Sequence, residues 1–209
     1  MSKAIDLSPI RTYFEDKLTE HGATPAGVDY NSITAMEARF SQILKVCDQS
    51  QPFTLLDFGC GFGALAGYLQ QKAVDFKFYG YDIVESMVVK ARQIYAGDER
   101  CVFSSDLAQI PVCDYVVESG IFNMRLKADY EEWTEYILHT LQQFNQYSRK
   151  GFAFNFLTKY SDAEYIQRRP DLYYADPCFY FDYCKRNFSR NVALLHDYEL
   201  YDFTILVRK

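Results

Sequence analysis

The stretch that decides the fold is LLDFGCGFGALAGYL, residues 55–69, where an apolar run leads into three glycines and then into a helical pattern. Gly59, Gly61 and Gly63 remove side chains where the backbone has to turn sharply and approach a ligand closely. In open α/β sheets, ligands bind beyond the carboxyl ends of the strands. Glycine clusters can also serve only tight packing of a strand against a helix. Three alternating glycines after a buried strand favour a binding turn.

Strand-like and helical stretches alternate along the chain. Buried strands are predicted at 53–58, 76–82, 101–104, 113–119 and 151–156, with helices at about 62–72, 84–95 and 130–148. Two last strands, 191–198 and 201–209, are so close in sequence that they can only be antiparallel neighbours. The pattern therefore predicts an α/β fold, with a seven-stranded, mostly parallel sheet, helices on both faces and an antiparallel C-terminal strand pair.

The first 50 residues are predicted to form two helices, roughly 9–20 and 33–47, joined by the loop HGATPAGVDYNS. Ser32 or Asn31 can cap the second helix. The 209 residues contain no repeat and no linker, so we expect a single domain, 1–209. Within it, residues 1–50 form an N-terminal helical lid and residues 51–209 form the core.

Composition narrows the classes of function. The net charge of −6 provides no basic surface for nucleic acid or for an anionic membrane. No apolar run is long enough for a leader or a membrane span, so we expect a cytoplasmic protein. The six cysteines include no C-x-x-C pair and are interpreted as reduced thiols, with no metal site.

Two classes of ligand fit the glycine turn. GCGFGA, residues 59–64, also matches the dinucleotide fingerprint G-x-G-x-x-G/A, and Asp82 stands where an acid would bind ribose. An NAD-dependent oxidoreductase is therefore one hypothesis. Asp57, however, would repel a pyrophosphate and suits a ligand with a cationic end, such as S-adenosyl-L-methionine. The Y-x-x-x-K match from Tyr68 to Lys72 lies within a predicted helix and is unsuited to hydride-transfer chemistry.

LLDFGCGFG closely resembles the D-x-G-x-G-x-G motif of the class I (Rossmann-like) S-adenosylmethionine-dependent methyltransferases. The predicted order of elements over about 53–209 is similar to that family too. The resemblance implies methyl transfer with S-adenosyl-L-homocysteine as the other product. It also implies that the N-terminal helices close over the cofactor.

The resemblance implies roles for the residues that match the family motifs. Asp57 and the backbone of the turn would surround the methionine part of the cofactor, and Asp82 would bind the ribose. Ile83 and residues 105–107 would contact the adenine, and residues 118–120 would line the place of methyl transfer. The implied cofactor-binding set is Asp57, Gly59, Cys60, Gly61, Gly63, Asp82, Ile83, Met87, Ser105, Asp106, Leu107, Glu118, Ser119 and Arg39. Asp106 could instead cap a turn, Met87 could pack in the core, and Arg39 could be an ordinary surface residue.

The methyl acceptor is less constrained by sequence. ESGIFN, residues 118–123, lacks the N/D-P-P-Y-like motif of family members that methylate nucleobase or glutamine amides. We therefore expect a small molecule, a sugar or a biosynthetic intermediate, methylated at oxygen or nitrogen. Candidate catalytic residues are His196 and Tyr30. Because no clear base is present, a non-catalytic cofactor-binding partner subunit is the remaining alternative.

Overall fold

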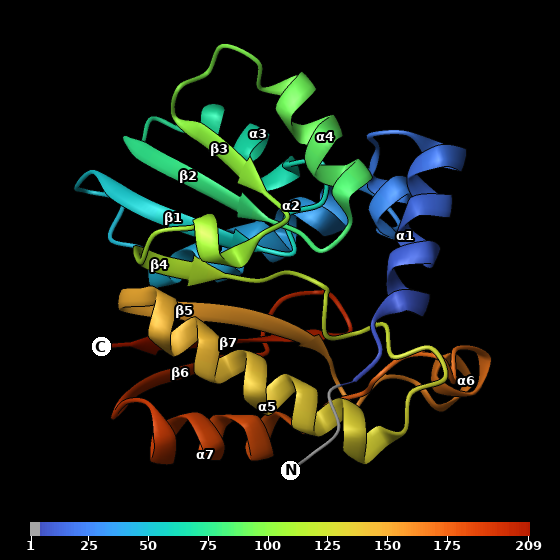
Figure 1. The fold of residues 1–209 in the computed structure, drawn as a ribbon. Coiled ribbons are helices and arrows are strands. Elements are labelled where there is room, and N and C mark those ends of the chain that lie inside the picture. The colour runs from blue at the N-terminus through green and yellow to red at the C-terminus, as the bar shows by residue number, and fades with distance from the viewer. Residues whose placement is uncertain (1–4) are drawn as a thin grey trace.

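The sheet of the computed structural model, which describes residues 5–209, has seven strands in the order β3-β2-β1-β4-β5-β7-β6 (Figure 1). Strands β1 to β5 pair in parallel, and β7 pairs antiparallel with both β5 and β6. This confirms the predicted α/β fold with its antiparallel C-terminal pair. The strands are β1 (Phe53–Phe58), β2 (Phe76–Tyr81), β3 (Cys101–Ser104), β4 (Cys113–Val117), β5 (Ser148–Leu157), β6 (Asn191–Leu195) and β7 (Asp202–Arg208).

Helices cover both faces of this sheet. One face packs against α2 (Ile33–Ile43), α3 (Ala64–Gln70) and α4 (Glu85–Ile94), and the other against α5 (Tyr130–Tyr147) and α7 (Pro177–Asn187). Successive strand residues point to opposite faces, so Leu55 joins the first core and Leu56 the second. Both leucines are fully buried, which explains why the strand reads as a continuous apolar run.

The N-terminal segment lies across the carboxyl ends of the strands (Figure 1). It consists of α1 (Ser8–His21), the short 3₁₀ helix η1 (Pro25–Val28) and then α2. Ser32 caps α2, since its side chain accepts a hydrogen bond from the backbone N–H of Ala35 at 3.1 Å. Helix α2 packs on one face of the sheet, whereas η1 reaches the glycine turn, where Val28 lies close to Gly61.

Several element bounds differ from the sequence-based expectation. Helix α2 ends at Ile43 and continues as the 3₁₀ turn η2 (Leu44–Val46). Strand β5 begins at Ser148 because it pairs with β4 from Cys113 onward. Strand β6 ends at Leu195, so the connection to β7 is longer than predicted. Tyr198 in that connection folds back, and its hydroxyl hydrogen-bonds to that of Thr204 at 2.8 Å.

The long segment between β5 and β6 holds the short helix α6 (Ala163–Arg168) and then α7. Isolated bridges from Met124 to Leu172 and from Thr158 to Ala175 attach it to the loop after β4 and to the end of β5. The segment lies beside the strand ends, and Ile10 of α1 packs against the cluster that contains its Leu172. Among residues 5–209, no helix is both long and apolar enough to cross a bilayer.

Candidate functional site

The glycine turn between β1 and α3 is fixed by the end of the neighbouring strand. The backbone N–H groups of Gly59 and Cys60 both donate to the carbonyl of Tyr81, at 2.7 and 3.0 Å. Gly61 has φ +53°, and a Cβ there would lie 2.9 Å from Cγ1 of Val28 in the lid. The turn therefore needs glycine both for its backbone conformation and for the close approach of the N-terminal segment.

Asp82, directly after β2, braces this turn from the side. Its Oδ2 accepts from the N–H of Gly61 at 2.8 Å, and its Oδ1 accepts from the N–H of Val84 at 2.9 Å. Each carboxylate oxygen has a further lone pair for a ligand, because a carboxylate accepts about four hydrogen bonds. Burial raises the pKa of Asp82, while the two backbone donors lower it.

Asp57, at the end of β1, is buried and faces the same cavity. Burial and the neighbouring charge of Asp82 raise the pKa of Asp57 to about 8, and no hydrogen bond from residues 5–209 offsets this. Glu118, at the end of β4, is fully buried; one of its oxygens accepts from the N–H of Ile121 and the other has no partner. Burial raises the pKa of Glu118 to about 8. Three carboxyl groups thus meet at adjacent strand ends.

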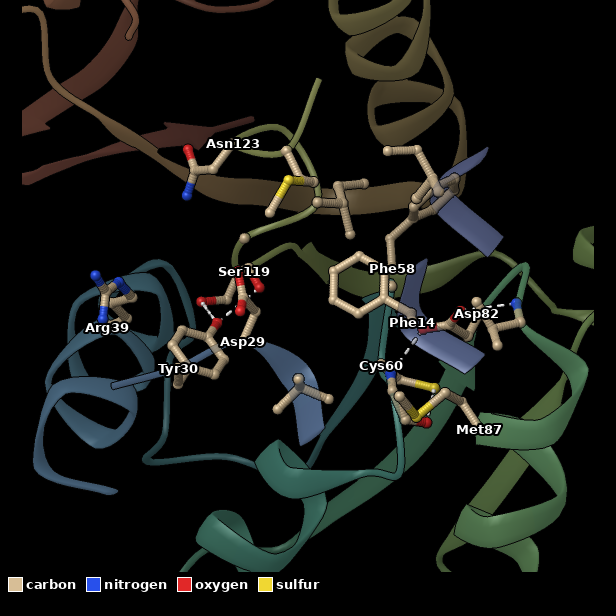
Figure 2. A pocket seen from close by; sticks show the side chains of 18 of the residues that line it. Phe14, Asp29, Tyr30, Arg39, Phe58, Cys60, Asp82, Met87, Ser119 and Asn123 are labelled. Atoms are coloured by element: carbon tan, nitrogen blue, oxygen red, sulfur yellow. Dashed lines mark hydrogen bonds between the residues drawn. The ribbon is translucent and has the colours of Figure 1, made fainter. Parts of the chain in front are cut away.

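These groups lie in and beside a cavity between the sheet edge, α1 and the segment after β5. Figure 2 shows Phe14, Cys60, Asp82 and Met87 gathered on one side of it, and Tyr30, Arg39, Ser119 and Asn123 on the other. We call these the glycine side and the Tyr30 side. Phe14 of α1 packs with Ile83, Val84 and Met87, so α1 covers the glycine side.

Comparison with known proteins agrees with this geometry. Residues 56–143 match the family described as a methyltransferase domain. The Mycobacterium tuberculosis protein named "Putative methyltransferase Rv1506c" is 47% identical over 166 residues, covering 79% of this chain and 99% of that protein. This chain belongs to the class I S-adenosylmethionine-dependent methyltransferases.

Solved structures share the fold of this methyltransferase. Magnesium protoporphyrin IX methyltransferase from Synechocystis, crystallised with S-adenosylhomocysteine, superposes with a TM-score of 0.68 at 18% identity, over 98% of this chain and all of that one. Human N-acetylserotonin methyltransferase, crystallised with S-adenosylmethionine, also gives 0.68 at 17% identity, over all of this chain and 60% of that one.

The structure brings most of the predicted cofactor residues of the methyltransferase to one cavity. Strand ends and the glycine turn supply the majority, and the lid helix α2 supplies one. Those that line the cavity are Asp57, Gly59, Cys60, Gly61, Asp82, Ile83, Met87, Ser119 and Arg39. The predicted set thus converges from elements that are far apart in the sequence.

Other predicted residues lie outside the lining. Gly63 approaches Tyr95 and Phe103 in the core, and Glu118 lies beneath the surface of the cavity. The hydroxyl of Ser105 donates to Glu85. Asp106 caps the 3₁₀ helix η3 (Leu107–Gln109) by accepting from the N–H of Ala108 at 3.0 Å, the alternative role considered for it. Leu107 packs against the core on the α5 side of the sheet.

The two candidate catalytic residues are placed differently. Tyr30 lines the cavity, and its hydroxyl lies 2.7 Å from Oγ and 2.8 Å from the carbonyl oxygen of Ser119. His196 is exposed beyond the end of β6, beside Tyr160, and is not part of the lining.

Sequence reasoning missed several residues that the fold brings to the cavity. Phe14 and Val28 come from the lid, Asn123 and Met124 from the loop after β4, and Arg169 from the segment after α6. None of these residues belongs to a local motif, so no signal in the sequence distinguishes them from ordinary helix and loop residues.

Proposed function

We propose that this methyltransferase binds S-adenosylmethionine on the glycine side of the cavity and transfers its methyl group to an oxygen or nitrogen atom of a small molecule. The observation that carries the proposal is the unpartnered carboxyl of Asp57 beside the backbone-anchored carboxylate of Asp82. A ligand with a cationic amino group and a sulfonium would favour the ionised form of both carboxyl groups.

The residues present fit this cofactor better than they fit a dinucleotide. Among residues 5–209, the basic residues that line the cavity are Arg39 and Arg169, and both are engaged by aspartates, Asp202 and Asp171. A pyrophosphate would thus face Asp57 and Asp82 without a free cation to balance it. This disfavours the NAD hypothesis.

Particular residues would hold each part of the cofactor. The free lone pairs of Asp82 suit the two ribose hydroxyls, and the apolar group of Phe14, Ile83 and Met87 suits the adenine. Asp57 and the backbone of the turn would receive the methionine part. When bound, the cofactor supplies an electrophilic methyl group; the protein positions the acceptor and excludes water.

The N-terminal segment over the cavity supports a small acceptor. Residues 1–50 would act as a lid on the 51–209 core within one domain, since Phe14 and Val28 line the cavity from above the turn. The relatives named above are named for the small molecules magnesium protoporphyrin IX and N-acetylserotonin. A sugar or a biosynthetic intermediate stays a prediction from the sequence.

Calorimetric titration with S-adenosylmethionine, S-adenosylhomocysteine and NAD tests this function. We expect the two sulfur ligands to bind and NAD not to bind. Asp82→Ala should weaken the binding of both by at least about tenfold, the loss of a charge-assisted bidentate contact. Asp182→Ala removes an exposed acid on α7 and is the matched control. Binding of NAD alone would overturn the proposal.

A further inference from the structure

The Tyr30 side of the cavity has an apolar wall. Met124, Leu157 and Leu172 form one buried cluster, with Ile10 and Tyr165 packed against it, and all five line the cavity. The bridge between Met124 and Leu172 holds the wall in place. A sugar presents hydroxyl groups in most directions and would leave them unpaired here, whereas an apolar skeleton would be buried favourably.

A directed chain of hydrogen bonds lies at the inner end of this wall, and Figure 2 shows its Tyr30–Ser119 part. The amide Nδ2 of Asn155 donates to Oγ of Ser119 at 3.1 Å, and the hydroxyl of Tyr30 meets both Oγ and the carbonyl of Ser119. All three bonds form together in one way only. A carbonyl cannot donate, so the single proton of Tyr30 goes to it, and the Ser119 hydroxyl donates to Oη of Tyr30.

The direction of these hydrogen bonds decides whether Tyr30 can donate to a ligand or accept from it. Its proton is used, and the remaining lone pair of Oη is an acceptor for an N–H or an O–H. A Cβ at Gly120 would lie 3.3 Å from this oxygen. The hydroxyl therefore lies just beyond the carboxyl end of β4, next to the glycine side of the cavity. Tyr30 therefore suits a positioning residue that orients a nucleophile.

Among residues 5–209, no side chain on this side is free to remove a proton. Histidine is absent from the described residues of the lining. Burial raises the pKa of Tyr30, which makes it a poor base. Asp29 is held by Lys17 at 3.0 Å and lies 3.8 Å from Arg169. An alcohol, which must lose its proton during methyl transfer, would therefore find no base on this side, since the proposed function assigns the unpartnered carboxyl of Asp57 to the methionine part of the cofactor.

A carboxylate acceptor would lack a cation. Arg39 donates Nε and Nη2 to Asp202 and Nη1 to the carbonyl of Ala35, which engages every nitrogen of its guanidinium. The cavity also contains Asp57 and Asp82, which repel a second anion. Transfer of a methyl group to an uncharged amine instead keeps one positive charge in the cavity throughout.

We infer that the acceptor is an apolar molecule with an uncharged amine nitrogen, whose N–H donates to Oη of Tyr30 while its skeleton packs against Ile10, Met124 and Leu172. The inference rests on the proposed function. In the reaction, the nitrogen lone pair forms the new N–CH₃ bond, the electron pair of the broken S–CH₃ bond stays on sulfur, and the methylated ammonium releases its extra proton to water.

Three probes with one skeleton separate the possibilities: 5-aminoindane, 5-hydroxyindane and indane-5-carboxylate, each titrated calorimetrically into the protein loaded with S-adenosylhomocysteine. We expect the amine to bind at least about tenfold more tightly than the other two. With S-adenosylmethionine, mass spectrometry should detect methylation of the amine alone. Equal binding or equal methylation of the alcohol or the carboxylate would overturn the inference, as would binding of none of the three.

Two variants test the residues. Tyr30→Phe keeps the ring and removes the acceptor oxygen, so amine binding should fall about tenfold while S-adenosylhomocysteine binding stays unchanged. Ile10→Ser, on the half-buried face of α1, should weaken all three probes equally. Tyr160→Phe changes an exposed tyrosine and is the control. Unchanged amine binding in Tyr30→Phe contradicts the inference; failure of S-adenosylhomocysteine to bind the unmodified protein contradicts the proposed function instead.

Discussion

Arg39 and Asp202 form a bidentate ion pair across 163 residues of sequence, with Nε–Oδ1 at 3.0 Å and Nη2–Oδ2 at 2.6 Å. Asp202 is fully buried at the start of β7, and Arg39 comes from α2. The pair ties the lid to the centre of the C-terminal half of the sheet. The guanidinium also lies over the ring of Tyr30, 5.3 Å from its centroid.

Replacing one partner of this pair should be strongly destabilising, because the other charge is left buried and uncompensated. Arg39→Met and Asp202→Leu should each lower the free energy of unfolding by about 3–5 kcal/mol. The double variant should recover most of that loss. Urea unfolding measures all three, and an additive double variant would show that the pair is not coupled.

The same double variant tests the cofactor-binding role predicted for Arg39. If Arg39 mainly holds the lid, Arg39→Met/Asp202→Leu should bind S-adenosylmethionine within about threefold of the unmodified protein. If Arg39 pairs with the methionine carboxylate, affinity should fall by at least about tenfold, the loss of a charge-assisted contact. Calorimetry distinguishes these results.

Asp57 should make cofactor affinity depend on pH. With its pKa at about 8, the carboxyl is largely protonated at neutral pH and must release its proton to face a cation. Affinity for S-adenosylmethionine should therefore rise with pH up to about 8, at close to tenfold per pH unit at most. Asp57→Asn should flatten this slope. Titration in buffers of different ionisation enthalpy measures the proton release directly, and an absence of release would contradict the expectation.

The free energy of unfolding should fall as pH rises, because the buried carboxyl of Glu118 resists ionisation in the folded protein. Its pKa is about 8 in the folded protein and near 4.5 when unfolded, so between these values the unfolded chain releases a proton that the folded one keeps. Glu118→Gln keeps an oxygen for the Ile121 N–H and cannot ionise. At pH 8 it should be more stable than the unmodified protein by on the order of 2 kcal/mol, and near pH 4 by much less. Thermal unfolding across this range checks the sign.

Two glycines of the turn should respond differently to alanine. At Gly63 a Cβ would lie 2.7 Å from Cε2 of Tyr95 and 3.0 Å from Cζ of Phe103, inside the core. Gly63→Ala should therefore cost about 1–3 kcal/mol of stability. At Gly61 the contact is with Val28 of the lid, so Gly61→Ala should weaken cofactor binding more than its loss of stability explains. If Gly61→Ala and Gly63→Ala lost stability and cofactor affinity in the same proportion, this distinction would be contradicted.

Much of the fold was predictable because it depends on local patterns. The strands at 53–58 and 113–117 are mostly apolar because both of their faces are covered, and the sequence shows this directly. The bounds of β5 and β6 were less predictable. They depend on pairing with β4 and β7, which lie elsewhere in the chain.

The sequence by itself determined the class of fold, the turn at Gly59 to Gly63 and the acids Asp57 and Asp82, because glycine conformation and strand-end position are local properties. Only the tertiary structure decided which residues line the cavity. It pairs Arg39 with Asp202, uses Asp106 as a cap, and brings Asn123 and Arg169 to the cavity. Such contacts join elements far apart in the chain, and no local spacing encodes them.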